Sequence, residues 1–546
     1  MLNLSRSFRA LVAVCSITVQ LGCVAQRRAD EGLGKPPEAT ELPSCQSAWA
    51  QLPVPDRSYQ LDRDGLSTPL GNQGYQSYRA RVAREQCQKE WTVLVYMAAD
   101  AKDLHRPALQ TLRSIEQGGL PADAEVDLVT QLDLFTQPGI RRLHVLGLAG
   151  AGTKSSDSGS EDPAQLRSPI VEYQADETTL PQQSLTEFLR WGVRNYPARR
   201  YMVVLWGHGL GWRPRPASPS RLNYDPANPL GGIALDESQL TVLDIPAVHD
   251  SLRTVSTERL GGRPFDVLAT DACLMQSVEV TTELADTARF FVGSEAKFDY
   301  EGLPYPAILG MMDKRADLEI PAAPSSRCVA GDTACALALR LPTLSLQQPP
   351  PVTGAAQRGP NFVLSVVDLP RLTSALVPSL QTLGQALKEY LREDPTRAVA
   401  IRNLLAVRTG MQMGLSRAIP DFPGGTRDLG IFLLNLRTII RRESERSDGA
   451  SSRAVLTAIE QAEGALTASI LSLAAGTRYD EERYRGLAGL STWLPSTDDE
   501  WNSRRDFFVP ARFFQPASTS TSTSTSTSTS TTSSWEGWLA ALFLTN

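Results

Sequence analysis

A cysteine and a histidine each lie directly after an apolar run of the chain. His208 stands in the segment WGHGLGW (residues 206–212), and Cys273 stands in the segment DACLM (residues 271–275). An imidazole within reach of a thiol stabilises the thiolate and carries its proton, and glycines beside the histidine let a substrate backbone come close. The two residues are therefore a candidate nucleophile and its acid and base.

Each of these residues alone has a simpler interpretation. A cysteine after an apolar strand is most often a small buried hydrophobic residue, and a histidine between glycines can be a turn residue. The chain has only four histidines, so a histidine and a cysteine at matching strand ends are less expected by chance. Their matching positions therefore favour catalysis over the simpler interpretations. The other three, His105, His144 and His249, lack this setting and are predicted to be structural or surface residues. No cysteines or histidines are paired at the spacing of a metal site.

The elements that position the pair should be buried strands. Apolar runs that predict strands lie at residues 91–97, 126–132, 142–146, 201–206, 265–270 and 290–293, with helical segments between them. Alternating strands and helices predict an α/β layered fold with a mostly parallel sheet. Ligands bind beyond the carboxyl ends of such strands. Residues 98–103, 207–212 and 271–275 should therefore lie near one site.

The rest of the chain divides into further predicted segments. Residues 326–360 are interpreted as an insertion or linker, and residues 361–510 as a more helical α/β region with amphipathic leucine patterns. Residues 511–546 are a predicted disordered Ser/Thr tail with a short apolar end. That end, residues 535–544, is too short to span a membrane and could dock on the body or lack structure.

The N-terminus resembles an export signal over residues 1–26, followed by an extension or linker over residues 27–88. Basic residues precede an apolar stretch that is too short for a membrane span. The stretch ends in LGC at Cys23, which resembles the lipobox of lipoproteins, where the cysteine is lipidated. Cleavage after Ala25 without lipidation is the alternative. We expect an exported protein, either lipid-anchored to the cell envelope at Cys23 or secreted.

The cysteine count is compatible with export. Of seven cysteines, Cys15 and Cys23 belong to the signal and Cys273 is reserved as a thiol, which leaves Cys45, Cys87, Cys328 and Cys335. An even remainder fits two disulfides, and Cys328 with Cys335 is the obvious local pair. Four unrelated reduced thiols are the alternative.

The composition excludes two broad classes of protein. With 42% hydrophobic residues and a net charge of −6, the chain is not disordered throughout. Its mild acidity and the lack of a Lys/Arg block give no field that would hold nucleic acid. We therefore expect no nucleic-acid partner.

The segments together resemble the clostripain-like cysteine peptidases. The resemblance lies in residues 93–100 (VLVYMAAD), 206–212, 271–284, 294–295 (SE), 302–305 (GLPY), 428–432 and 489–491. It covers residues 91–312 and continues in patches to about residue 495. It implies a caspase-like three-layer sandwich with a mostly parallel central sheet as the peptidase core, residues 89–325, followed by the more helical C-terminal region.

The resemblance implies an endopeptidase that cleaves after Arg or Lys through a Cys273–His208 dyad. Asp271 is the candidate for binding a guanidinium at the foot of the substrate pocket, and its alternative role is to cap a helix beginning near Leu274. Backbone N–H groups of Gly209 and Cys273 would form the oxyanion hole. Further candidates for binding the substrate are Ser294, Glu295 and Asp299, with Glu301 as a weaker one.

The expected partners are proteins or peptides that contain Arg or Lys. The chemistry requires no cofactor, although some relatives need calcium, whose ligands here cannot be named. Self-cleavage after Arg213, Arg215 or Arg221 is a further expectation from the resemblance. Two alternatives remain: an inactive relative that binds peptides or envelope material, and a Cys–His amidase that acts on cell-envelope substrates.

Overall fold

The computed structural model describes the greater part of residues 88–544. The described residues are 88–118, 124–135, 137–145, 166, 168, 170–174, 180–215, 231–298, 302–313, 327–329, 331–347, 362–407, 425–445, 449–476, 479, 484–515 and 533–544. The predicted signal, nearly all of the N-terminal extension and most of the Ser/Thr tail lie outside them. The segment boundaries given above stay predictions.

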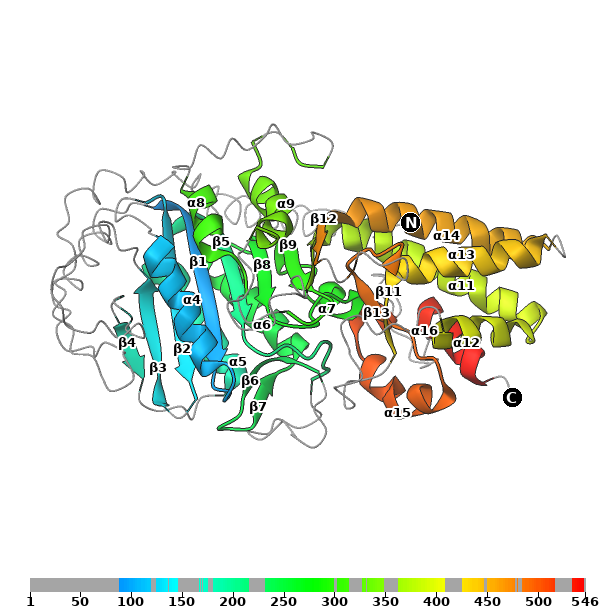
Figure 1. The fold of residues 1–546 in the computed structure, drawn as a ribbon, viewed down its shortest axis with the longest axis horizontal. Coiled ribbons are helices and arrows are strands. Elements are labelled where there is room, and N and C mark those ends of the chain that lie inside the picture. Colours follow the sequence, from blue (N-terminus) through cyan, green and yellow to red (C-terminus); the bar gives the residue numbers. More distant parts are fainter. Residues whose placement is uncertain are drawn as a thin grey trace, which may run out of the picture. The chain divides into compact units, whose positions relative to one another are not determined.

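Within the described residues, nine strands form one sheet (Figure 1). Their order is β12-β10-β9-β8-β5-β1-β2-β3-β4. The strands are β1 (Lys89–Ala99), β2 (Val126–Leu134), β3 (Gln137–Val145), β4 (Ile170–Gln174), β5 (Ala198–Trp206), β8 (Phe265–Asp271), β9 (Ala288–Ser294), β10 (Val363–Asp368) and β12 (Ile470–Ala475). The five central strands, from β9 to β2, are parallel, and the outer ones are antiparallel.

The central strands form where the sequence has continuous apolar runs. Every residue of β8 is buried, and so is every residue of β5 from Tyr201 to its end. A parallel sheet is covered by helices on both faces, which explains why its strands lack an alternating polar pattern. The predicted mostly parallel sheet is confirmed.

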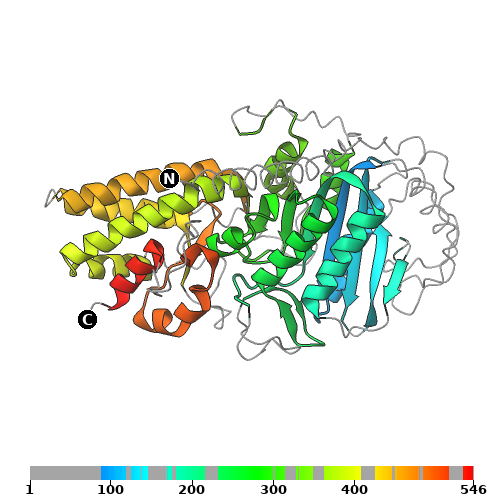
Figure 2. The same cartoon turned by 180° about the vertical axis from the view of Figure 1, so that it is seen from behind.

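Helices cover both faces of the sheet, as Figures 1 and 2 show from opposite sides. One face packs on α5 (Pro181–Asn195) and α6 (Ile245–Arg259), and the other on α4 (His105–Gly118), α8 (Tyr305–Met312) and α9 (Thr333–Ser345). Adjacent strand residues face opposite layers: Val203 belongs to the first core and Val204 to the second. This is the caspase-like three-layer arrangement expected from the sequence.

The chain continues into a helical C-terminal region, as predicted. Its elements are α11 (Val377–Glu393), α12 (Arg397–Val407), β11 (Thr426–Asp428), α13 (Leu429–Ser444), α14 (Ala450–Ser469), β13 (Ser491–Trp493), α15 (Asp498–Phe508) and α16 (Ser534–Leu544). The apolar end, whose state the sequence left open, forms α16 and buries Trp535 and Trp538 in the core that continues from the sheet. The burial of these apolar side chains accounts for the docking of α16.

Two cysteines and the helix lengths bear on the expected location of the protein. Cys328 and Cys335 form a disulfide, as the local pairing predicted. Cys45 and Cys87 lie outside the described residues. Of the helices that the structure describes, none has both the length and the apolar character needed to cross a bilayer.

Candidate active site

The loops that carry His208 and Cys273 leave the sheet side by side. Strands β5 and β8 are parallel neighbours, with Trp206 opposite Asp271 at their carboxyl ends. The N–H of Gly207 donates to the carbonyl oxygen of Asp271 at 3.3 Å. The two loops therefore lie together at one edge of the sheet, as the sequence predicted.

A glycine makes the close approach of these loops possible. A Cβ atom on Gly209 would lie 2.2 Å from the carbonyl oxygen of Cys273 and 2.9 Å from the Cβ of Ala272. Real atoms do not approach so closely, so any larger residue would push the histidine loop away from the cysteine loop. The glycine beside His208 therefore sets the separation of the two loops.

Cys273 precedes a sharp turn of the backbone. Leu274 has a φ of 62°, in the left-handed region that branched side chains seldom adopt. The turn is held from outside, because the N–H groups of Leu274 and Gln276 donate to the carbonyl oxygens of Ala296 and Ser294 at 3.0 and 3.1 Å. Strain that is fixed by surrounding hydrogen bonds is typical of functional sites.

The sulfur of Cys273 has a hydrogen-bond donor beside it. Cys273 is half-buried and is not part of a disulfide. The backbone N–H of Phe298 donates to Sγ at 3.2 Å. Sγ also lies 3.7 Å from the carbonyl oxygen of Phe298, to which the thiol can donate, while the N–H group would stabilise the thiolate once it forms.

His208 contacts a carboxylate that the sequence analysis did not assign. Its Nε2 lies 2.9 Å from Oδ1 of Asp103, and the side chains are 27% and 47% exposed. An ionised carboxylate only accepts hydrogen bonds, so Nε2 carries a proton in this contact, and in the neutral imidazole Nδ1 is then the acceptor. Asp103 lies in the segment after β1 that was expected near the site, and this position was the available signal.

The histidine loop also presents the predicted oxyanion donor. Gly209 forms an isolated bridge with Ile233 of β6 (Ile233–Asp236). Two backbone hydrogen bonds flank this bridge. The N–H of Ala234 donates to the carbonyl oxygen of His208, and the N–H of Leu210 donates to the carbonyl oxygen of Gly232. Neither of them uses the N–H of Gly209.

Asp271 is buried at the end of β8 and bonded to neutral groups. It is 5% exposed and accepts hydrogen bonds from the hydroxyl of Tyr305 at 2.8 Å and the N–H of Leu303 at 3.2 Å. Among the described residues, no cationic side chain forms an ion pair with it. Burial raises the pKa of Asp271 to about 6, and the two donors oppose that rise.

Asp271 does not cap a helix. The next helix is α7 (Val278–Glu283), whose first turn is capped by Ser277, with its hydroxyl accepting from the N–H of Val280. The alternative role for Asp271 is therefore wrong, because the chain makes the turn at Leu274 where that helix was expected.

Comparison with known proteins identifies the family. A model of the clostripain family matches residues 95–396, which is more than half of the chain. The chain belongs to the clostripain family. Its members include C11 cysteine proteases, and among curated proteins no relative matches this clostripain-family chain.

Solved structures similar to this clostripain-family chain are distant in sequence. A secreted C11 cysteine protease from Bacteroides thetaiotaomicron, in complex with an irreversible peptide inhibitor, has 18% identity and a TM-score of 0.47, with 78% of this chain and 98% of that one covered. An inactive zymogen C11 protease from Parabacteroides distasonis has 17% identity and a TM-score of 0.43, with 77% and 96% covered.

Two predicted substrate contacts of the clostripain-family chain lie in its interior. Ser294 and Glu295 are 0% and 2% exposed. The hydroxyl of Ser294 accepts from the N–H groups of Ala296 and Val363, and the carboxyl of Glu295 faces that of Asp428. Their predicted contact with substrate is wrong for this structure, because both side chains are buried inside the chain. The other two candidates, Asp299 and Glu301, lie outside the described residues.

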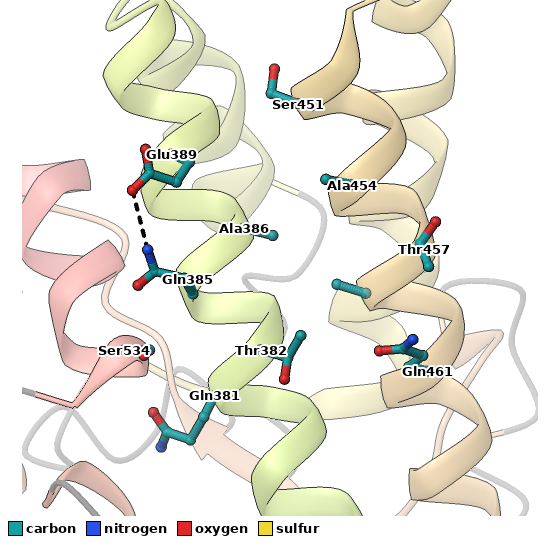
Figure 3. A pocket seen from close by; sticks show the side chains of 11 residues that line it. Gln381, Thr382, Gln385, Ala386, Glu389, Ser451, Ala454, Thr457, Gln461 and Ser534 are labelled. Carbon is teal, nitrogen blue, oxygen red and sulfur yellow. Dashed lines mark hydrogen bonds between the residues drawn. The ribbon is translucent and has the colours of Figure 1, made fainter.

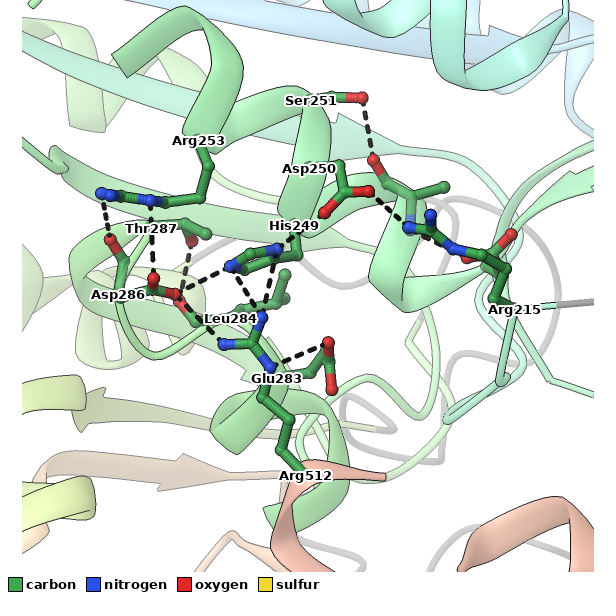
Figure 4. Close-up of polar contacts among 12 residues, drawn as sticks. Arg215, His249, Asp250, Ser251, Arg253, Glu283, Leu284, Asp286, Thr287 and Arg512 are labelled. Carbon is green, nitrogen blue, oxygen red and sulfur yellow. Dashed lines mark hydrogen bonds and ion pairs between the residues drawn. The ribbon is translucent and has the colours of Figure 1, made fainter. Parts of the chain in front are cut away.

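The remaining histidines have partners away from the cysteine. His105 Nδ1 contacts the oxygen of Phe135, and His144 Nε2 contacts buried Asp127. His249 lies in a charged network with Asp250, Asp286, Glu283, Arg215 and Arg512 (Figure 4). Arg215, a predicted self-cleavage position, thus forms an ion pair with Asp250. Arg213 is described as well, and Arg221 lies outside the described residues.

Three carboxylates could hold a cation next to the site. Oxygen atoms of Asp100, Asp133 and Asp236 lie within 4.8 Å of one another, after β1, in β2 and in β6. Burial raises the pKa of Asp100, against the effect of a hydrogen bond from Ser238. Carboxylate oxygens are the ligands that Ca²⁺ prefers, so the donor set fits the calcium allowed by the resemblance. Bound there, the ion would neutralise crowded negative charge.

A groove in the helical region contains none of the predicted catalytic residues. It lies between α11 and α14 and has a volume of about 680 Å³ (Figure 3). Its walls carry short polar and amide side chains, including Gln381, Gln385 and Gln461, and Ser534 lies at one end.

Proposed function

We propose that the chain is a cysteine endopeptidase that hydrolyses peptide bonds after Arg or Lys, with Cys273 as nucleophile and His208 as acid and base. The observation that carries the proposal is the strained turn at Leu274, which presents the thiol of Cys273 beside the histidine loop at the carboxyl edge of the sheet. A binding protein needs neither the strained turn nor the adjacent imidazole.

The reaction would use the two neighbouring loops that carry His208 and Cys273. The N–H of Phe298 stabilises the thiolate as Nδ1 of His208 takes the proton. The thiolate attacks the scissile carbonyl carbon, and the N–H groups of Gly209 and Cys273 stabilise the oxyanion. His208 protonates the departing amine, which leaves a thioester. It then takes a proton from water, which attacks the thioester and releases the acid and Cys273.

Asp103 would orient the imidazole. Its contact with Nε2 fixes which nitrogen carries the proton and stabilises the imidazolium that forms after proton transfer. Because both side chains are partly exposed, this contribution is smaller than that of a buried partner.

Asp271 would select the basic residue before the cleaved bond. A buried carboxylate with two neutral donors and no cation is poorly compensated, and its raised pKa reflects this. A guanidinium or ammonium group from the substrate supplies the missing positive charge. Asp271 ends the strand that leads into the cysteine loop and lies two residues before the nucleophile.

Export is part of the proposal. The predicted signal over residues 1–26 supports it, and the disulfide between Cys328 and Cys335 suits an oxidising compartment. Whether Cys23 carries a lipid is tested by labelling with a radioactive fatty acid, which Cys23→Ser abolishes if the anchor exists.

One assay tests the activity and its competitors. Fluorogenic peptides with Arg, Lys, Asp or an uncharged residue before the reporter are incubated with wild type, Cys273→Ala and His208→Ala. We expect cleavage after Arg and Lys, reduced at least about 10⁴-fold in both variants. Ser277→Ala, in the same loop, removes the hydroxyl that caps α7 and is the control that keeps activity.

The other outcomes identify the alternatives. Activity that survives Cys273→Ala would falsify the assignment of the nucleophile. Cleavage after Asp but not Arg removes the proposed role of Asp271. Binding of Arg peptides without cleavage indicates an inactive relative, and hydrolysis of envelope amides alone indicates an amidase.

A further inference from the structure

The segment that holds the cysteine turn carries a buried carboxyl group. Ala296 and Ser294 accept the hydrogen bonds from the turn through their carbonyl oxygens, and Glu295 lies between them. The N–H of Glu295 donates to the oxygen of Val363 in β10 at 3.2 Å. Any movement of Glu295 would therefore reach the turn at Leu274 through two adjacent hydrogen bonds.

The carboxyl group of Glu295 has no N–H or hydroxyl donor among the described residues. Both oxygens are buried without a conventional partner, and the residue is 2% exposed. The group that it faces is the carboxyl of Asp428, at the end of β11. A buried, ionised carboxylate in this position would have neither water nor a donor to stabilise it.

Asp428, in contrast, is surrounded by donors. Its Oδ1 accepts from the N–H of Ile431 at 2.7 Å, which caps α13. Its Oδ2 accepts from the N–H groups of Ala488 and Gly489, both at 3.0 Å. Burial raises the pKa of Asp428 to about 6, and its three backbone donors oppose that rise, whereas Glu295 has no such donor, so the proton of the pair resides on Glu295.

We propose that Glu295 is a positioning residue of the peptidase: as a neutral acid, it donates a hydrogen bond to Asp428 and fixes the segment behind Cys273 to the C-terminal region. This proposal rests on the proposed function. A second contact runs in parallel, because the N–H of Ser491 in β13 donates to the oxygen of Gln276 at 3.0 Å. The C-terminal region thus holds both the cysteine loop and the segment behind it.

The contact should weaken as the pH rises. Burial, and then the charge of Asp428, raise the pKa of Glu295 well above its ordinary value. Tyr479 and Tyr484 belong to the hydrophobic cluster that contains Ala296, the residue after Glu295. When Glu295 loses its proton, two carboxylates face each other, and the hydrogen bond is replaced by repulsion.

The sign of the effect on stability follows from proton binding. Glu295 keeps a proton in the folded protein that the unfolded chain releases near pH 4.5. The stabilising contribution is complete below that value and is lost as the pH rises toward the raised folded pKa. An amide at this position keeps a donor and has no proton to lose.

The test compares Glu295→Gln and Glu295→Leu with a parent protein that keeps Glu295. Melting temperatures are measured from pH 5 to pH 9 in a Cys273→Ala background, which removes catalysis. We expect the melting temperature of Glu295→Gln to rise relative to its parent as the pH increases, by about 2–4 °C at pH 8.5. A difference that does not change with pH overturns the proposal.

The positioning role is tested by the reactivity of Cys273, which alkylation measures even if no peptide is cleaved. Alkylation of Cys273 by iodoacetamide, and kcat for an Arg peptide, should be retained in Glu295→Gln and fall about tenfold in Glu295→Leu at pH 7. KM should change little, since Glu295 does not touch substrate. Unchanged alkylation in a folded Glu295→Leu overturns the positioning role.

The two proposals fail differently. If the melting and alkylation results are as expected and no peptide is cleaved, the peptidase proposal fails and Glu295 keeps its positioning role. If Arg peptides are cleaved and alkylation is the same in all variants, Glu295 has no positioning role and the peptidase proposal stands.

Discussion

The carboxyl ends of β8 and β9 each bury an acid beside the cysteine loop, but in different surroundings. Asp271, at the end of β8, accepts from a tyrosine hydroxyl and a backbone N–H, whereas Glu295, just after β9, faces another carboxyl. Burial raises the pKa of both acids. Under the two proposals the neighbours decide the role: Asp271 ionises and receives a cation, while Glu295 keeps a proton to donate.

The largest expected difference between these acids is in substrate selection. Asp271→Asn removes the charge that would pair with Arg or Lys and leaves a neutral group of equal size. We expect kcat/KM for Arg peptides to fall about 30- to 1,000-fold, as when one partner of a buried charge pair is lost. The matched change at the other position, Glu295→Gln, should leave this value nearly unchanged.

Peptides with an uncharged residue at that position provide the control in the same assay. Their cleavage, where measurable, should not decrease in Asp271→Asn. Equal losses for charged and uncharged peptides would mean that Asp271 supports the loop and does not select the substrate.

The second difference concerns the stability of the substrate-free protein. The pKa of Asp271 is raised from 3.8 to about 6, so the folded protein is stabilised less as the pH rises through 6. Asp271→Asn should therefore raise the free energy of unfolding at pH 8 by about 1–3 kcal/mol. Urea unfolding at pH 5 and pH 8 checks this, and an equal effect at both pH values contradicts it.

The third prediction concerns how kcat/KM for Arg peptides decreases as the pH falls. Protonation of Asp271 below about pH 6 removes the charge that binds the substrate. The ratio of kcat/KM for an Arg peptide to that for an uncharged peptide should fall toward tenfold per pH unit below this value. Because the ratio cancels the titration of the nucleophile and base, a flat ratio between pH 4 and pH 7 would exclude Asp271 as the binding group.

The smallest effect should follow from Tyr305→Phe. This change removes the 2.8 Å hydrogen bond from the hydroxyl to Asp271, which favours the ionised carboxylate. The acid limb should move to higher pH by about one unit, with little change in cleavage at pH 8. Measuring the same ratio of kcat/KM values checks the shift, and an acid limb that stays in place shows that the hydroxyl does not tune Asp271.

The sequence predicted the parts of the site that depend on local pattern. Continuous apolar runs located β5 and β8, and parallel strands bring their carboxyl ends to one edge, which placed His208 beside the loop of Cys273. Asp271 could be singled out because it belongs to the same short segment. Each of these inferences uses residues near one another in the chain and a general rule of sheet topology.

Contacts between distant segments could not be predicted in this way. Asp103 and His208 belong to different loops, and Glu295 meets Asp428 from another region of the chain. Proximity to Cys273 in the sequence suggested that Glu295 faces the substrate, but the direction of its side chain depends on how β9 packs against the C-terminal region. The docking of α16 depends in the same way on the apolar surface that other helices provide.

Strand β12 has a practical meaning for anyone who shortens this protein. It pairs with β10 at the border of the large sheet, yet its residues come after the part that matches the family. A fragment cut at residue 396 would leave β10 with a row of unpaired backbone donors and acceptors. Such an exposed edge strand promotes aggregation. Recombinant versions should therefore keep the chain at least through Ala475.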